Sequence, residues 1–322
     1  MKTHYITWWN LENLFDTYDS KSRPKWLAKK LSSELKGWTN EILEKKLENI
    51  SSVIKQINSN NGPDIFGICE VESEIVIQKL IDKLNIPNRN YGVVHFDTKD
   101  RRGIDIAFIY DKHKYTFDGK MFHYEVLKRS ATRDIFQAGF ITRNKNRLIL
   151  IGNHWPSRSG SQYKSEPYRM MAGETLSYWL KKIMEIHGKK TPVIVMGDFN
   201  DEPFSQSLRE YALSSNNRKK VVYGKNPYLY NLMWKLYGEK KATYVFNSNL
   251  QIIDQFLVTK GLLLSSGKFS CDESSVRIEV FNGMIKGRYN IPVRFGRPSK
   301  KSSFNLNGFS DHLPVSFIIN EK

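Results

Sequence analysis

The sequence predicts an α/β protein, because apolar strands alternate with helical segments and one strand–helix–strand pattern occurs twice. The strands are nearly continuous apolar runs, which is typical of strands that are covered on both faces. In both patterns, polar or acidic residues follow directly after the strands. The two units comprise strands over 4–9 and 64–69 around a helix over 40–58, and strands over 148–152 and 193–197 around a helix over 168–187.

Each predicted helix has its own signal. In the first, apolar residues recur at helical spacing. The second is followed by Gly188, a residue that commonly ends helices. The apolar positions of the first helix are Ile42, Leu43, Leu47, Ile50, Val53, Ile54 and Ile57.

Four further strands are expected after these units, whereas the polar and basic stretches are expected to be loops. Residues 16–37 are polar and predict an excursion between the first strand and the first helix. No linker is long enough to separate two domains, so we expect one domain over 1–322. The further strands are predicted over 103–110, 138–142, 252–258 and 313–317, and solvated basic loops over 218–220, 235–241 and 296–303.

Composition restricts the class of protein. The chain has 322 residues, of which 40% are hydrophobic, enough for a substantial core. There is no apolar run of about 18 residues that could span a bilayer. Residues 1–10 do not resemble a secretion signal, and Cys69 and Cys271 cannot form a disulfide framework. We therefore expect a cytoplasmic protein without an integral membrane segment.

The net charge of +17 favours polyanionic partners, because lysine and arginine neutralise phosphates and release their counterions. A biased genome composition also produces lysine-rich surfaces. The charge therefore supports a phosphate-bearing substrate without identifying it.

Polar residues at the strand ends are the first candidates for a site. Asn10, Glu70, His154 and Asp198 each end an apolar strand, and open α/β sheets place ligands beyond the carboxyl ends of their strands. Phosphate ester cleavage needs a cation or basic donors, an activated water and a stabilised leaving oxygen. Mg²⁺ serves this chemistry with only one or two carboxylates.

Two short motifs add to these strand ends. Gly197-Asp198-Phe199-Asn200 follows a strand, and extended backbone would point the side chains of Asp198 and Asn200 in one direction. Taken alone, the motif is ordinary turn chemistry. The run Ser310-Asp311-His312 before the last predicted strand is unusual, and a surface turn is the weaker of its two explanations even when the run is taken alone.

A set of eight polar residues occurs along the chain in the order and at the strand ends of a known superfamily. Chance agreement of so many elements is very improbable, so this set decides between the interpretations. From Trp8 to His312, the chain resembles the endonuclease/exonuclease/phosphatase superfamily, which includes pancreatic-type deoxyribonuclease, abasic endonucleases, neutral sphingomyelinases and inositol polyphosphate 5-phosphatases. Segments 9–16, 102–105 and 153–160 are most similar to its bacterial subgroup. The resemblance implies two packed mixed β-sheets flanked by helices, a four-layer α/β sandwich, with the site at one edge. The set comprises Asn10, Glu70, His154, Asp198, Asn200, Asp254, Asp311 and His312.

The resemblance also implies a metal site. Glu70 would be the principal Mg²⁺ ligand, and Asn10 and Asp311 would complete or support the site; Mn²⁺ is a possible substitute. Glu12 is a candidate second carboxylate, which we keep outside this set. Glu72 is expected to be exposed or to act only through its neighbours.

The other residues of the set would handle the water and the phosphate. Asp198 would orient or deprotonate the attacking water and Asn200 would hold the phosphate. His312 would contact the phosphate, with its ring fixed by Asp254. Whether Asp198 or His312 is the base stays open.

Residues around His154 extend this assignment. His154 would donate toward the phosphate or the leaving group, as in deoxyribonuclease-like members, and Arg133 would clamp phosphate oxygens. Asp105 is a candidate to orient His154, with a satisfied strand residue as the alternative. For Arg102 and Arg158, contacts to the phosphate and solvated salt bridges are equally plausible.

We therefore expect a monomeric, metal-dependent hydrolase in which water attacks directly, because no Ser or Cys nucleophile motif is present. DNA is the first choice of substrate, from the net charge, His154 and Arg133, and the basic loops are expected to track its backbone. One alternative is a phospholipid or phosphoinositide substrate, with Trp26 and Trp38 as exposed aromatics. Another is a noncatalytic nucleic-acid-binding module, which should have lost some of the metal and water residues.

Overall fold

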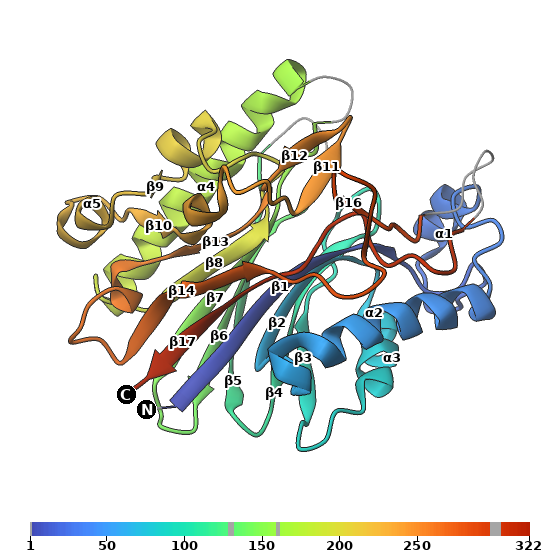
Figure 1. Ribbon diagram of the computed structural model, residues 1–322, viewed down its shortest axis with the longest axis horizontal. Helices are drawn as coiled ribbons and strands as arrows, with labels where there is room; N and C mark the ends of the chain where they lie inside the picture. The colour runs from blue at the N-terminus through green and yellow to red at the C-terminus, as the bar shows by residue number, and fades with distance from the viewer. Residues whose placement is uncertain (1, 128–131, 159–161, 297–303) are drawn as a thin grey trace.

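The strands form two mixed sheets that face one another, and helices lie on their outer sides (Figure 1). The computed structural model describes residues 2–127, 132–158, 162–296 and 304–322. The four-layer α/β sandwich predicted from the sequence is therefore confirmed. The two chain ends lie next to each other, because the first strand pairs antiparallel with the last.

Each sheet contains one of the predicted strand pairs at its centre. The six-stranded sheet has the order β14-β17-β1-β2-β4-β3 and the seven-stranded sheet the order β5-β6-β7-β8-β13-β10-β9. The first contains β1 (Lys2–Leu14), β2 (Ile65–Val71), β3 (Tyr91–His95), β4 (Asp105–Asp111), β14 (Phe269–Ile278) and β17 (Val315–Glu321). The second contains β5 (Tyr115–Tyr124), β6 (Ile135–Thr142), β7 (Arg147–His154), β8 (Val193–Asp198), β9 (Ser214–Ser215), β10 (Leu229–Asn231) and β13 (Asp254–Val258).

The remaining elements are helices and two small ribbons. The α-helices are α1 (Lys25–Leu31), α2 (Asn40–Asn60), α3 (Glu74–Leu84), α4 (Gln162–His187) and α5 (Arg218–Tyr223). Short turns of other helix types are η1 (Ser207–Tyr211), η2 (Leu232–Leu236) and η3 (Lys260–Leu262). The ribbons pair β11 (Tyr244–Phe246) with β12 (Asn249–Gln251) and β15 (Ile285–Lys286) with β16 (Ile291–Pro292).

The twofold pattern in the sequence corresponds to two parallel strand pairs. β1 pairs parallel with β2 and is connected to it through α2. β7 pairs parallel with β8 and is connected to it through α4. The carboxyl ends of each pair therefore lie at the same edge of their sheet.

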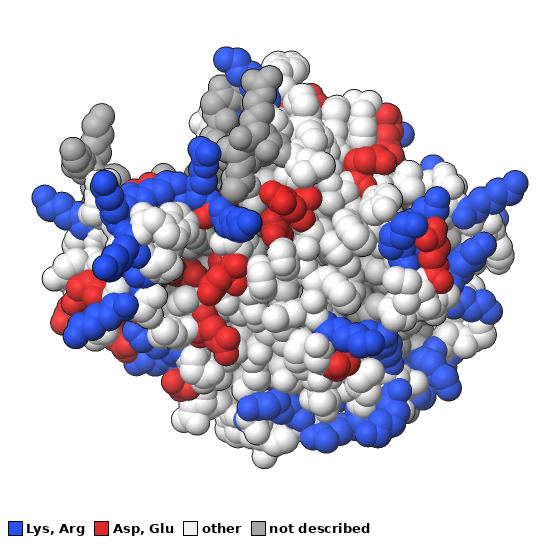
Figure 2. Space-filling model, turned by 180° about the vertical axis from the view of Figure 1, so that it is seen from behind, with Lys and Arg blue, Asp and Glu red and all other residues white. Residues whose placement is uncertain are grey.

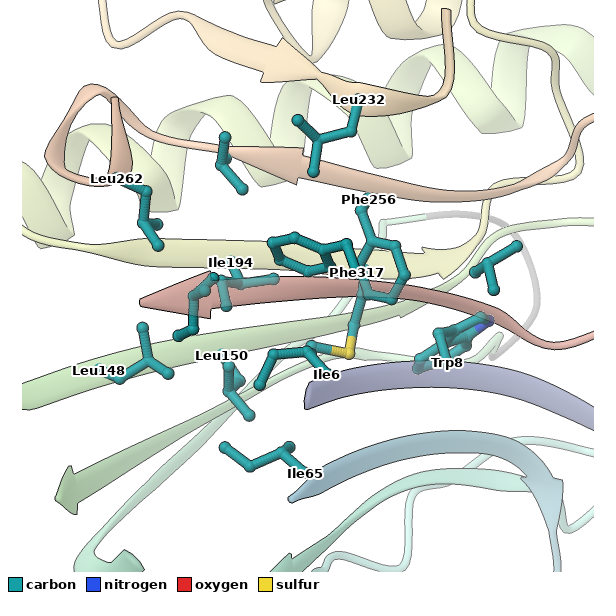
Figure 3. Close-up of a cluster of buried hydrophobic side chains, with 14 of the residues drawn as sticks. Ile6, Trp8, Ile65, Leu148, Leu150, Ile194, Leu232, Phe256, Leu262 and Phe317 are labelled. Carbon is teal, nitrogen blue, oxygen red and sulfur yellow. The ribbon is translucent and has the colours of Figure 1, made fainter. Parts of the chain in front are cut away.

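Side-chain alternation explains why the central strands are apolar on both faces. Leu148 and Leu150 of β7 join the core between the sheets, whereas Ile149 and Ile151 pack in the layer that includes α4. Figure 3 shows Leu150 and other side chains of both sheets filling the space between them. Each fully buried apolar side chain contributes about 1.5–3 kcal/mol.

Three local expectations need correction. The polar excursion contains α1, which is held by only two buried leucines, too few to show as a periodic pattern. The basic run at 218–220 begins helix α5 instead of forming a loop, because the Asn217 side chain accepts from the Lys220 amide and caps the helix. α4 begins at Gln162, earlier than predicted. Most of the predicted loop at 296–303 lies outside the described residues.

None of the helices in the described ranges combines the length and the apolar character that a bilayer-spanning segment needs.

Candidate active site

The four predicted strand-end residues meet where the two sheets open. Glu70, His154 and Asp198 line a cleft of about 720 Å³, together with Asn200, Arg133, Asp311 and His312. Asn10 and Asp254 are buried and hydrogen-bond to cleft residues. The structure thus brings together all nine residues that the sequence assigned to the site.

A break in the pairing of β1 with β2 presents Glu70 to the cleft. The register shifts after the Asn10–Cys69 pair, and Glu70 has a left-handed φ of 61°. Such a φ is uncommon for a residue other than glycine and costs of order 1–3 kcal/mol. The amide of Asn13 donates to Glu70 Oε2 over 3.0 Å and fixes the carboxylate.

Opposing influences act on the Glu70 carboxylate. Burial alone would raise its pKa, but the charges of Arg102 and Arg133 outweigh burial and lower it. Glu70 Oε1 lies 3.7 Å from Arg102, too far for a hydrogen bond. The carboxylate is therefore ionised and keeps one oxygen toward the cleft.

Asp198 lies at the centre of the site. Its Oδ2 accepts from the Asn10 side-chain amide (3.1 Å) and its Oδ1 from the Asn200 backbone amide (2.9 Å). Burial raises its pKa to about 7. The preceding Gly197 is required by close packing of β7 on β8, since a Cβ there would lie 2.4 Å from the Asn153 carbonyl oxygen.

His312 is held by a buried carboxylate, as the resemblance implied. Its Nδ1 lies 2.7 Å from Asp254 Oδ2, and the Trp8 indole donates to Asp254 Oδ1 (3.2 Å). Burial alone would lower the His312 pKa, but Asp254 and Asp198 outweigh burial and raise it well above its usual value. The ring is therefore an imidazolium, with Nε2 lying 3.8 Å from Asp198 Oδ2.

His154 lies near the same carboxylate oxygen as His312. Its Nε2 also lies 3.8 Å from Asp198 Oδ2, so the two imidazole nitrogens lie within twice that distance of one another. Burial and the charges of Arg133 and Arg102 lower the pKa of His154 well below its usual value. An Arg133 N–H donates to Nε2 over 3.2 Å, which places the proton of the neutral ring on Nδ1.

Asp105, the candidate to orient His154, has other partners in the structure. Asp105 does not orient this ring, because its Oδ1 accepts from Thr98 and its Oδ2 faces His95. Among the described residues, His154 Nδ1 has no hydrogen-bond partner. β4 begins at Asp105, and the loop before it bends back over this carboxylate.

Asn200 reaches the cleft from a turn. β8 ends at Asp198, and Asn200 has a φ of 50°. The prediction that one extended strand points both side chains in the same direction was therefore wrong. The Asn200 amide donates to the Trp155 carbonyl (3.0 Å). Arg158 donates to the Asn200 carbonyl (2.7 Å) and supports the turn. For Arg102 and Arg158, the sequence left open a contact to the phosphate or a solvated salt bridge. Arg102 lines the cleft, where it can reach a phosphate.

Sequence reasoning did not assign Arg294, which also lines the cleft. Its Nε donates to buried Glu12 over 2.7 Å, and a terminal nitrogen lies 3.5 Å from Asp311 Oδ2. Fully buried Lys46 donates to the Glu12 carbonyl. The ring of Tyr244 packs 4.8 Å from that of His312. The sequence held one sign of this buried charged cluster around Glu12. Lys46 is a charged residue among the apolar positions of the predicted first helix.

Glu12 and Glu72 are both buried and engaged with arginines. Burial raises the pKa of Glu12 to about 6, and Arg294 occupies its carboxylate. Glu72 pairs with buried Arg23 and accepts from the Asp16 amide (2.7 Å). Glu72 therefore supports the loop after β1 and is not exposed.

A buried ion pair anchors α4 beside the turn that follows β8. Arg169 is completely buried, with its Nε 2.8 Å from Asp201 Oδ2. We expect Arg169→Met to lower the free energy of unfolding by about 3–5 kcal/mol, because it leaves the Asp201 charge buried without this partner. Urea denaturation would measure the change. Exposed Arg209 provides the control, since Arg209→Met should stay within about 0.5 kcal/mol. Equal urea midpoints for both variants would contradict the prediction.

The donors in the cleft fit a hard divalent cation. Glu70 and Asp311 offer carboxylate oxygens, the ligands that Mg²⁺ prefers. Asp198, Asp254 and His312 also lie close enough to share an ion, with ligand atoms within 4.8 Å of one another. The 2.7 Å hydrogen bond between Asp254 and His312 already occupies two of those atoms. An ion there would have to displace that contact, whereas Glu70 and Asp311 each present a carboxylate to the cleft.

Comparison with known proteins bears on the family and the fold. A family model described as "Endonuclease/Exonuclease/phosphatase family" matches residues 5–321. No curated protein matches the sequence significantly.

Solved structures share the fold at low sequence identity. A humanized TDP2 from D. rerio is 14% identical, with a TM-score of 0.62 and 99% of each chain covered. An endonuclease/exonuclease/phosphatase from Bacteroides vulgatus is 14% identical, with a TM-score of 0.58 over 100% of each chain. D. rerio TDP2 complexed with a single-strand DNA product is 13% identical, with a TM-score of 0.60, covering 99% of this chain and 100% of that one.

Proposed function

Because the chain belongs to the endonuclease/exonuclease/phosphatase family, we propose that it is a divalent-metal-dependent phosphodiesterase that cleaves nucleic acid, with DNA as its substrate. The observation that carries the proposal is the convergence on Asp198. Two imidazoles with opposite protonation approach one oxygen of a carboxylate whose pKa is raised to about 7. Groups whose pKa values are pushed apart in this way are typical of acid–base sites.

In this proposal, Asp198 positions the attacking water and accepts its proton. A pKa near neutrality suits a general base. Asn10 donates to the same carboxylate and sets its orientation, so Asn10 supports the site through Asp198. The turn that follows presents Asn200 to the phosphate.

His312 and Arg133 would neutralise the phosphate. The His312 imidazolium, fixed by Asp254, offers an N–H from Nε2, and Arg133 offers several from its guanidinium. A phosphate oxygen that takes the Arg133 hydrogen bond would release His154 Nε2. The neutral His154 ring would then be able to carry its proton on Nε2 and donate it toward the substrate.

Glu70 and Asp311 would hold the metal ion, and Mg²⁺, or Mn²⁺ in its place, would supply charge neutralisation and stabilisation of the leaving oxygen. The noncatalytic alternative expects some of these residues to be missing. All of the predicted metal and water residues are present in or beneath the cleft, which favours catalysis.

The choice of DNA is supported by charge within the cleft. Arg102, Arg133, Lys164 and Arg294 line it. The basic segments at 218–220 and 235–241 do not, and Arg218 and Lys235 pair with Glu273. Figure 2 shows Lys and Arg side chains spread over one face, many near its margins, with Asp and Glu groups among them. The arginines of the cleft are therefore better candidates for phosphate contacts than the surface charge.

The lipid alternative depends on exposed aromatic side chains. Trp26 is 54% exposed, but Trp38 is completely buried, so one of the two expected aromatics cannot contact a lipid surface. The resemblance of the fold to TDP2, one structure of which holds a single-strand DNA product, also favours nucleic acid.

A substrate panel tests the proposal directly. The purified protein is incubated with supercoiled DNA, abasic duplex, RNA, sphingomyelin and phosphoinositides in Mg²⁺, Mn²⁺ or EDTA. We expect nicked plasmid with either metal and loss of cleavage in EDTA, because the carboxylates of Glu70 and Asp311 need a cation to face a phosphate. Glu70→Gln, which removes one of these charges, should behave like the EDTA sample. Release of lipid headgroups without nicking would overturn the choice of substrate.

A further inference from the structure

A second cluster of potential metal ligands lies outside the cleft, between β3 and β4. His95 ends β3, Asp105 begins β4, and Asp97 lies in the connecting segment. One ligand atom from each residue lies within 4.8 Å of the others. His95 pairs with Ala107 across the ladder, so Asp105, two residues before Ala107, is its diagonal neighbour on the same face.

The imidazole of His95 is the feature that ordinary packing does not explain. Its side chain is only 3% exposed, and its Nε2 has no hydrogen-bond partner among the described residues. Nε2 points to Asp105 Oδ2 at 3.8 Å, which is too long for a hydrogen bond. A buried polar atom without a partner costs about 1–3 kcal/mol. A ligand between these two atoms would remove that cost.

The two flanking carboxylates differ in how they are held. Asp105 Oδ1 accepts from the amide (3.1 Å) and hydroxyl (2.5 Å) of Thr98, which fixes the carboxylate and leaves Oδ2 toward His95. Such hydrogen bonds typically orient metal ligands. The side chain of Asp97 is 80% exposed and lies 3.8 Å from Nδ1, the other ring nitrogen of His95, so this carboxylate has to turn toward Nε2 to share an ion there.

We propose that His95, Asp105 and Asp97 form a binding site for a divalent transition metal of the Zn²⁺ class. One imidazole and two carboxylates suit Zn²⁺, which leaves a fourth position for water. Zn²⁺ bonds of about 2.0–2.2 Å in a tetrahedron place neighbouring ligand atoms about 3.4 Å apart. The observed 3.8 Å between His95 Nε2 and Asp105 Oδ2 needs only a small closure. Mg²⁺ would not compete well, because it prefers oxygen ligands.

The position of the site suggests what a bound ion would do. Segment 96–104 connects β3 to β4 and contributes Arg102 to the wall of the cleft. Arg102 in this segment lines the cleft and donates to Asn13, and Asp100 lies 3.9 Å from Arg133. An ion bound at the base of the segment would hold this wall in place. The proposal does not depend on which substrate the cleft accepts.

Zn²⁺ alone is the probe. The metal ligands of the cleft are first removed with Glu70→Gln, Asp311→Asn and His312→Ala, and Zn²⁺ is then titrated into this protein by calorimetry in excess Mg²⁺. We expect about one Zn²⁺ per chain, with the stoichiometry confirmed by elemental analysis after dialysis. Adding His95→Gln or Asp105→Asn should weaken binding at least about 10-fold.

His123→Ala is the matched control, since this half-exposed imidazole stacks on Phe96 beside the cluster and pairs with Asp134 instead. It should leave the affinity for Zn²⁺ unchanged. Circular dichroism melting identifies any variant that fails to fold, and His95→Asn is then used in place of His95→Gln. Absence of Zn²⁺ binding after removal of the cleft ligands, or equal losses in the His95 and His123 variants, would overturn the proposal.

Discussion

Asp198→Asn should lower turnover of DNA by at least about 10²–10⁴-fold while leaving the fold intact, because the amide cannot accept the proton of the attacking water. The replacement has nearly the same shape, and its single side-chain oxygen can still accept from one of the two present donors, the Asn10 side chain or the Asn200 amide. It also removes the carboxylate that faces both imidazoles. Initial rates of plasmid nicking at saturating Mg²⁺, compared with thermal melting, separate loss of chemistry from loss of structure.

Asp272→Asn is a suitable control, because it makes the same change on β14, outside the residues that line the cleft. Its turnover should equal that of the unmodified protein. An Asp198→Asn variant with unchanged melting temperature and near-normal turnover would remove Asp198 from the catalytic role. The role of the base would then fall to His312, oriented by Asp254, once this imidazolium has lost its Nε2 proton.

The strand ends were predictable because their signals are local. Apolar runs predicted β1, β2, β7 and β8, and the polar residues after these runs placed Asn10 and Glu70 at an edge of one sheet and His154 and Asp198 at an edge of the other. The physical rule is that parallel strands within a sheet end at the same edge. That two such edges face one another came from the resemblance, since periodicity within one sheet contains no information about the other.

Side-chain contacts made by loops, whether near or far along the chain, were not predictable in the same way. Arg294 reaches Glu12 across 282 positions, and Asp105 turns to Thr98 and His95 instead of His154. Alternation along a strand specifies the face on which a side chain lies, but the loop that covers this face decides its partner. The helix at 218–223 was hidden for another reason, because its only apolar anchors are Val221 and Val222.

His154→Ala should also lower turnover at least about 10²-fold, because the variant loses the neutral donor that faces Asp198 and the phosphate site. His113→Ala is the control, since this exposed imidazole lies outside the cleft and should leave the rate unchanged. Unchanged nicking by His154→Ala would refute the assignment.

A model diester with a good leaving group decides which oxygen His154 serves. The p-nitrophenolate ion leaves without protonation, so bis(p-nitrophenyl) phosphate should be cleaved almost normally by His154→Ala if the ring protonates the leaving oxygen. If His154 instead donates to a nonbridging phosphoryl oxygen, as its contact with Arg133 suggests, DNA and the model diester should lose rate by similar factors. We expect the second result. A ring in contact with Arg133, which is proposed to bind the phosphate, lies beside the phosphoryl oxygens whichever group departs.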